Sequence, residues 1–267
     1  MITGEQATTA ARIGDLTLAC PRCRAPLVPD GDGAVRCTVE GDRFPNEDGI
    51  WCFLLPERER RLAQFMAEYA AVRRAEGRGD DDPSFYRALP FHDLTGRFVD
   101  DWRIRAVSYQ ALVNRVLPPL ETRWRRPLRI LDLGAGNCWL SYRLARRGHR
   151  VVAVDLLTDL RDGLGAYVHY DAVFTPVQAE FDRLPFADGQ ADLAIFNASL
   201  HYSPDYATTL REVLRVLAPE GQVVILDSPV YRDARSGEQM LREREAEFTR
   251  RFGFPSNSLP SEGYLTV

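Results

Sequence analysis

Two carboxylates and a glycine turn near the middle of the chain have the spacing of a nucleotide-binding site. Residues 130–156 read ILDLGAGNCWLSYRLARRGHRVVAVDL, so that one apolar segment leads through Asp132 to Gly134 and Gly136, and a second ends at Asp155. Glycine lets the backbone approach a ligand closely, and an acid that closes the second strand can accept hydrogen bonds from both ribose hydroxyls. The pattern predicts a βαβ unit that binds a ligand with an adenosine-like part.

The residues of the glycine turn limit which kinds of ligand can bind there. A dinucleotide fingerprint has a third glycine three residues after the second, where this chain has Trp139, so a pyrophosphate is disfavoured. The chain contains no lysine, which excludes a phosphate-binding P-loop. A carboxylate at Asp132 would repel phosphate oxygens and suits a ligand that presents an ammonium group, as S-adenosylmethionine does.

Several later segments follow in the order found in one enzyme family. They read EFDRLPF at 180–186, ADLAIFN at 191–197, SLHY at 199–202 and LREVLRVLAPEGQVVILDSP at 210–229. With the first unit, they resemble the class I S-adenosylmethionine-dependent methyltransferases, of the type 11 kind, over about residues 128–229. No single motif is decisive, but their order is specific.

The resemblance implies a set of site residues. Glu180 would take the adenine amino group, and the backbone of Phe181 would take a ring nitrogen. His201 is the candidate base, with Tyr202 beside it, although a histidine that only shapes the pocket remains an alternative. Arg105 could reach the methionine carboxylate from a lid. The cofactor-binding set that the resemblance implies is Asp132, Gly134, Ala135, Gly136, Asp155, Leu156, Glu180, Phe181 and Asn197.

The key loop departs from the family at one position. The family usually has glycine where this chain has Cys138. A thiol is small enough to fit if the backbone there does not have a positive φ, and a buried cysteine that acts as a small apolar residue is the simplest interpretation. The effect of Cys138 on the affinity for the cofactor therefore depends on the backbone conformation at this position.

A second candidate site lies near the N-terminus. Two residues separate Cys20 from Cys23, a spacing that lets two thiolates reach one tetrahedral zinc ion, and Cys37 is a candidate third ligand. Glu40 stands three residues after Cys37, where a fourth cysteine is expected. Two interpretations of this segment remain. It is either a zinc site of three cysteines and one carboxylate, or a zinc ribbon that has lost its metal.

The predicted fold is α/β, with a Rossmann-like methyltransferase sheet that has helices on both faces. A small zinc-ribbon-like module and a helical lid precede it. The strand pair that closes such sheets at the C-terminal end is missing, so that an exposed strand edge remains. The predicted divisions are a flexible lead at 1–19, the zinc-ribbon-like module at 20–55, a helical linker and lid at 56–120, and the S-adenosylmethionine-binding domain at 121–267.

Composition limits the classes of function. A net charge of −4 argues against a general nucleic-acid binder, and the absence of lysine excludes Schiff-base chemistry. No apolar run approaches the length of a membrane span, and five cysteines in 267 residues do not form a disulfide scaffold. We expect a cytoplasmic protein.

Three functions compete. The first is methyl transfer to an oxygen, nitrogen or carbon atom of a small-molecule metabolite. The second is methylation of a ribosomal or transfer RNA base, which only the resemblance of the cysteine segment to modules of ribosomal-RNA methyltransferases supports. The third is an inactive cofactor-binding scaffold that recruits a partner. The expected partners are a small-molecule acceptor, with RNA less favoured, and either a second copy or another protein that covers the sheet edge.

Overall fold

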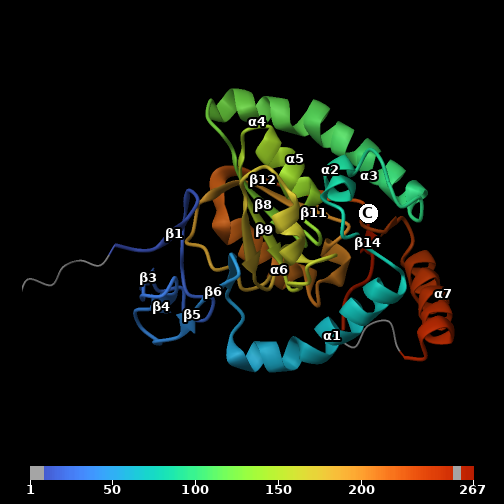
Figure 1. Ribbon diagram of the computed structural model, residues 1–267, viewed down its shortest axis with the longest axis horizontal. Coiled ribbons are helices and arrows are strands. Elements are labelled where there is room, and N and C mark those ends of the chain that lie inside the picture. The colour runs from blue at the N-terminus through green and yellow to red at the C-terminus, as the bar shows by residue number, and fades with distance from the viewer. Residues whose placement is uncertain (1–8, 255–259) are drawn as a thin grey trace, which may run out of the picture.

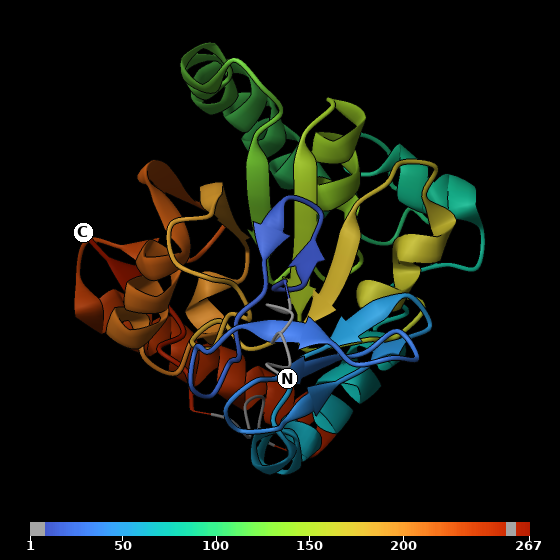
Figure 2. The ribbon, with the colours of Figure 1, turned by 90° about the vertical axis from the view of Figure 1, so that its left-hand side faces the viewer.

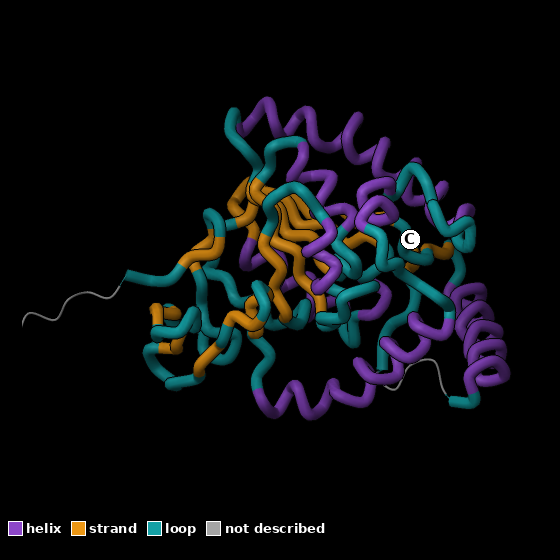
Figure 3. Tube along the Cα trace, viewed as in Figure 1, coloured by secondary structure: helices purple, strands orange, loops and turns teal. Residues whose placement is uncertain are grey.

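One twisted sheet forms the centre of the molecule, with helices around it (Figures 1 and 3). The computed structural model describes residues 9–254 and 260–267. The sheet has seven strands in the order β12-β11-β8-β9-β10-β7-β6, and all neighbours are parallel except β6 and β7. Its strands are β6 (Asn46–Glu47), β7 (Ile50–Cys52), β8 (Arg129–Leu133), β9 (Arg150–Asp155), β10 (Thr175–Gln178), β11 (Ala191–Asn197) and β12 (Leu217–Leu226). The predicted α/β fold is confirmed.

Alternating side chains divide the core between the two faces of the sheet. Leu131 and Leu133 of β8 point to one face, where they join the cluster that contains α6 (Tyr206–Val216). Ile130 points to the other face and packs with α5 (Trp139–Arg146). Since both faces are covered, the central strands are apolar throughout, as parallel sheets require.

Helices that precede β8 extend past the carboxyl ends of the strands. α1 (Pro56–Ala75) lies on one side and α3 (Val99–Ala111) on the other (Figure 1). α1 thus begins at the start of the region 56–120, which the sequence predicts as a helical linker and lid. The remaining helical segments of this region are α2 (Pro83–Ala88), the π-helical turn η1 (Leu112–Val116) and α4 (Leu117–Trp124). Two short 3-10 segments, η2 (Leu164–His169) and η3 (Leu200–Tyr202), follow later strands.

The prediction of a flexible lead at 1–19 is wrong for its second half. β1 (Arg12–Ile13) and β2 (Leu16–Thr17) form an antiparallel pair. The side chains of Ile13, Leu16 and Leu18 are buried in the same core as β8, and burial of three apolar side chains holds this segment on the domain. Residues 1–8 lie outside the described part.

The cysteine segment is continuous with the central sheet. β3 (Leu27–Pro29), β4 (Val35–Cys37) and β5 (Arg43–Phe44) form a small antiparallel sheet, which lies in front of the larger one in Figure 2. After these strands, β6 pairs with β7, and β7 pairs in parallel with β10. Phe44 also shares a buried cluster with residues of β8 and β9. The cysteine segment therefore supplies the edge strands of the central sheet and shares a buried apolar cluster with it.

The opposite edge of the sheet ends at β12. Within residues 9–254 and 260–267, no strand pairs with the outer side of β12. The chain continues instead through β13 (Val230–Tyr231) and α7 (Ala234–Phe252) to β14 (Leu265–Thr266), and β13 pairs with β14 away from the main sheet. No helix among the described residues is both long and apolar enough to cross a membrane.

A buried carboxylate ties the loop before β8 to the start of β11. Asp192 is fully buried and accepts hydrogen bonds from Arg126 Nη1 at 2.7 Å, from the Arg129 backbone N–H at 2.8 Å and from Arg129 Nη2 at 2.8 Å. Burial alone would raise the pKa of Asp192, but the hydrogen bonds from the two arginines outweigh it and lower the pKa below its usual value.

We predict that Asp192→Ala destabilises the protein by about 3 kcal/mol at pH 7, because it leaves two half-buried arginines without their partner. Since the folded pKa is lowered, this contribution is present above the unfolded pKa and is lost as the pH falls through the folded value. Asp100→Ala is the matched control, because Asp100 is 82% exposed in its pair with Arg103 and should cost less than about 1 kcal/mol. Urea unfolding at pH 7 and pH 3 checks this, and equal effects of the two substitutions at pH 7 would contradict it.

Candidate functional site

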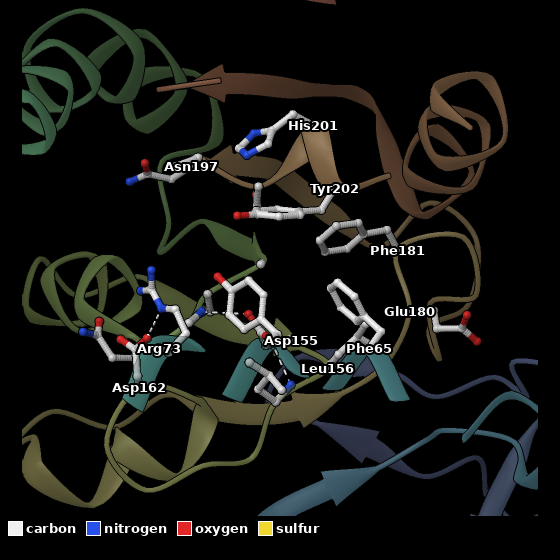
Figure 4. Close-up of a pocket in the computed structure, with 18 of the residues that line it drawn as sticks. Phe65, Arg73, Asp155, Leu156, Asp162, Glu180, Phe181, Asn197, His201 and Tyr202 are labelled. Carbon is white, nitrogen blue, oxygen red and sulfur yellow. Dashed lines mark hydrogen bonds and ion pairs between the residues drawn. The ribbon is translucent and has the colours of Figure 1, made fainter. Parts of the chain in front are cut away.

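A cavity of about 560 Å³ lies at the carboxyl ends of the central strands, between α1 and α3 (Figure 4). Open parallel sheets bind ligands at this edge. The predicted site residues that line it are Gly134, Ala135, Gly136, Asp155, Leu156, Glu180, Phe181, Asn197, His201 and Tyr202. The structure therefore brings all but one of the predicted cofactor and catalytic residues to one cavity.

The glycine turn after β8 is held by hydrogen bonds to the end of β9. The backbone N–H groups of Gly134 and Ala135 both donate to Val154 O, at 2.8 and 3.1 Å. Gly134 has a φ of +77°, and a Cβ added there would lie 2.3 Å from the Cβ of Ser199. Only glycine fits this position, which explains why the turn can pass so close to the neighbouring strand end.

Asp155 lies at the centre of the cavity floor. Its Oδ2 accepts the Gly136 N–H at 2.8 Å, and its Oδ1 accepts the Leu157 N–H at 2.9 Å. Burial raises the pKa of Asp155, although these backbone donors act in the opposite direction. Each carboxylate oxygen keeps a further lone pair, so the side chain can also accept hydrogen bonds from a ligand diol in the cavity.

Asp132 is the exception among the predicted residues, and the structure corrects its placement. It does not line the cavity. Its position in β8 directs the side chain to the face covered by α5, where its Oδ2 accepts a hydrogen bond from Ser141 Oγ at 2.7 Å. Burial raises the pKa of Asp132 to about 7. Asp155 and Glu180 line the cavity but Asp132 does not, so the three predicted carboxylates do not meet in one site.

Cys138 has the backbone conformation that glycine usually supplies. Its φ is +65°, so the condition under which a thiol was expected to fit is not met. The side chain is nevertheless fully buried and contacts Gly136 O and Leu164 O, at 3.6 and 3.9 Å. It does not line the cavity. The thiol thus leaves the space above the turn open.

Glu180 lines the cavity but its carboxylate already has a partner. Arg58 of α1 forms a two-point ion pair with it, with Nε to Oε2 at 2.9 Å and Nη2 to Oε1 at 2.5 Å. In Figure 4 the carboxylate points away from the side chains around Asp155. The adjacent Phe181 ring packs edge-on against Phe196 and forms an apolar wall. A contact from Glu180 to an adenine amino group would therefore compete with Arg58.

Residues after β11 form the opposite wall. The Oδ1 atom of Asn197 and the Nδ1 atom of His201 are buried and have no hydrogen-bond partner among the described residues. Burial, and to a smaller extent the charge of Arg244, lowers the pKa of His201 to about 4. His201 is therefore neutral at pH 7. The Tyr202 ring lies next to it, and both point into the cavity (Figure 4).

α1 also contributes to the site, within the region that the sequence predicts as a helical linker and lid. Its side chains Phe65 and Tyr69 line the cavity. Tyr69 lies edge-on to Tyr202, and Arg73 forms an ion pair with Asp162 across the cavity rim. The aromatic side chains on one helical face were the available signal, but such a stripe fits a core equally well.

The three predicted zinc ligands lie together outside this cavity. The Sγ atoms of Cys20, Cys23 and Cys37 are all within 4.8 Å of one another, and none of these cysteines forms a disulfide. The backbone N–H groups of Val39 and Glu40 point at Cys37 Sγ, at 3.4 and 3.3 Å. A tetrahedral zinc ion with bonds of about 2.3 Å needs sulfur atoms about 3.8 Å apart, so the cluster fits such an ion.

Comparison with known proteins agrees with the site. The family model described as "Methyltransferase domain" matches residues 131–225. Among curated proteins, the chain is 35% identical to malonyl-[acyl-carrier protein] O-methyltransferase of Halorhodospira halophila, over 45% of this chain and 41% of that protein. It is 32% identical to demethylmenaquinone methyltransferase of Thermus thermophilus, over 44% of this chain and 60% of that protein.

Other matches are more limited. Arsenite methyltransferase of Aquipseudomonas alcaligenes is 29% identical, over 43% of this chain and 36% of that protein. A solved S-adenosylmethionine-dependent methyltransferase of Mesorhizobium loti aligns with a TM-score of 0.35 and 30% identity, over 39% of this chain and 48% of that chain. The chain spans less than half the length of the first curated relatives.

The matched region contains the glycine turn, Asp155, Phe181 and the strand ends that form the cavity. Residues 131–225 are therefore similar to the methyltransferase domain family, and this similarity covers the part of the chain that forms most of the cavity.

Proposed function

We propose that this protein transfers a methyl group from S-adenosylmethionine to an oxygen, nitrogen or carbon atom of a small-molecule metabolite. The observation that carries the proposal is the cavity in which the glycine turn and Asp155 face the aromatic wall of Phe181, inside the region that matches the family. The relatives are named for three different acceptors, two small molecules and a malonyl group on an acyl-carrier protein, so their likeness favours a small acceptor group and leaves its identity open.

The cavity residues suit the parts of the cofactor. The lone pairs left on Asp155 can take the ribose hydroxyls, and Leu156 and Phe181 offer apolar surfaces for the adenine ring. The backbone of Gly134 to Gly136 can approach the methionine part because the turn has little side-chain bulk. When bound, S-adenosylmethionine would supply an electrophilic methyl group: as the acceptor bonds to the methyl carbon, the bond from that carbon to sulfur breaks, sulfur keeps the electron pair, and the cofactor becomes a neutral thioether.

The remaining chemistry is positioning. In-line displacement depends on holding the acceptor atom close to the methyl group and aligned with it. His201 and Tyr202 form the wall at which the acceptor would lie, and His201 is neutral at pH 7. With a pKa of about 4, His201 is a weak base, so it can help only an acceptor that loses its proton easily or needs to lose none.

The cysteine cluster supports a second, independent proposal. Cys20, Cys23 and Cys37 would hold a structural zinc ion. The fourth ligand would be a water molecule, or the exposed Glu40 carboxylate after its side chain has moved towards the cluster. Their convergence, with backbone N–H groups directed at Cys37 Sγ, is what supports it. Zinc there would hold the two turns of the segment together.

Cofactor binding is the first test. Asp155→Ala should lower the affinity for S-adenosylhomocysteine by tenfold or more. The substitution removes the hydrogen bonds that the Asp155 carboxylate would accept from the ribose hydroxyls, and hydrogen bonds to a charged group are worth about 1.5–3 kcal/mol each. Cys138→Ala should change the affinity by less than about twofold, since its thiol faces away from the cavity. Isothermal calorimetry measures both. If the unaltered protein gives no binding heat, the proposed function fails.

The protonation of His201 is the second test. The chain has four histidines, so His201→Gln identifies the imidazole signal of His201 in an NMR titration. We expect a midpoint near pH 4, because the buried ring is desolvated. A midpoint near 6.5 would contradict this and would make His201 a general base suited to neutral pH.

Zinc is the third test. The purified protein should contain a stoichiometric amount of zinc, and Cys23→Ser should lose most of it. Glu40→Cys should slow zinc release to a chelator, because it completes a four-thiolate site, whereas Glu40→Ala should not slow it. Sub-stoichiometric zinc after gentle purification, or no effect of Glu40→Cys, would count against the site.

A further inference from the structure

The α3 side of the cavity presents hydrogen-bond donors that have no acceptor. Trp102 and Arg105 are three residues apart on α3, which places them on the same helical face, and both line the cavity. The Nε1 atom of Trp102 is buried without a partner among the described residues. An indole N–H and a guanidinium can only donate, so the group that satisfies them must be an acceptor.

The charge of Arg105 is poorly compensated within the protein. The nearest ion-pair partner in the described residues is Asp101, whose Oδ2 lies 3.9 Å from Arg105 Nη1, too far for a hydrogen bond. The same carboxylate oxygen accepts a hydrogen bond from Arg78 at 3.2 Å. Burial, with Arg78 and Arg73 as neighbouring cations, lowers the pKa of Arg105 although Asp101 and Asp227 oppose this effect. The Arg105 side chain is 21% exposed, and a largely desolvated cation that lines a cavity favours an anionic ligand.

The α3 face reaches from the glycine turn to the end of β12. Trp102 packs edge-on against Trp139, at the start of the helix that follows the turn. Ser108, two turns further along the same face, donates a hydrogen bond to Asp227, which follows β12. In the sheet, β11 separates β12 from β8, β9 and β10, whose ends carry the residues proposed to hold the nucleoside. Arg105 stands between Trp102 and Ser108 on this face, and therefore between the glycine turn and β12.

We propose that Trp102 and Arg105 form a subsite for an acidic group, a carboxylate or a phosphate, carried by the methyl acceptor. The subsite would fix the orientation of the acceptor through charge-assisted hydrogen bonds from Arg105, with the indole N–H as a second donor. This inference rests on the proposed methyl transfer and adds the substrate class. The methionine carboxylate of the cofactor is the other source of the same chemistry, and the experiment separates the two.

The first arm measures cofactor binding to the unaltered protein and to Arg105→Gln by calorimetry. The ligands are S-adenosylhomocysteine and methylthioadenosine, which lacks the amino-acid part. We expect Arg105→Gln to change both affinities by less than about twofold. A tenfold loss for S-adenosylhomocysteine alone would assign Arg105 to the cofactor and overturn the inference. If S-adenosylhomocysteine fails to bind the unaltered protein, the proposed function itself fails, and that result is distinct.

The second arm uses protein saturated with S-adenosylhomocysteine. A panel of small carboxylic acids and phosphate monoesters, each paired with its neutral amide or alcohol, is screened by ligand-observed NMR. The acidic members should bind about tenfold more tightly than their neutral partners, and Arg105→Gln should remove this preference. Trp102→Phe keeps an aromatic ring at this position but removes the indole N–H donor, and it should reduce the preference for acidic compounds by a few-fold.

Arg103→Gln is the matched control. It makes the same change of charge on the same helix, but the Arg103 side chain is 75% exposed and pairs with Asp100 outside the cavity. The acid preference should persist in this variant. Equal binding of acidic and neutral compounds to the unaltered protein, or an acid preference that survives Arg105→Gln, would overturn the inference.

Discussion

The site depends on one local constraint, the hydrogen bonding of the glycine turn to the end of β9. Gly134 and Ala135 donate to Val154 O, and Gly136 donates to the side chain of Asp155. These bonds fix the turn in a left-handed conformation at Gly134 and Gly136. They also hold the Asp155 carboxylate at the cavity floor, so the same contacts shape the turn and position the acid.

Much of this arrangement could be predicted from the sequence. The glycine spacing and the terminal acid of the second apolar segment predicted the βαβ unit, and the order of the later motifs predicted the parallel sheet around it. The cavity then brings together residues from separate motifs, such as Asp155, Phe181 and His201. These predictions succeeded because each residue follows a strand, and the carboxyl ends of parallel strands meet at one edge.

The errors have physical causes that a linear pattern does not contain. Asp132 is two residues before the first glycine, but alternation along β8 turns its side chain towards α5. Glu180 has the expected position, yet Arg58 from a distant helix occupies its carboxylate. The segment around Leu16 has no clear period, so its burial depends on tertiary contacts alone. In each case a partner far away in the chain decides where a side chain lies.

The N-terminal part of the chain contributes more to the molecule than an attached module would. β7 extends the sheet beside β10, and the chain then enters α1, which lines the cavity. Arg22, between two of the clustered cysteines, pairs with Glu57 in the first turn of α1. The next residue, Arg58, holds Glu180. The cysteine cluster and the cavity are thus linked through consecutive residues of one helix.

A crystal structure with S-adenosylhomocysteine tests the central claim most directly. The account predicts that the ribose hydroxyls donate to the Asp155 carboxylate, that the adenine ring lies between Leu156 and Phe181, and that the glycine turn keeps its hydrogen bonds to Val154 O. A nucleoside bound elsewhere on the molecule, or one in this cavity without contact to Asp155, would contradict it.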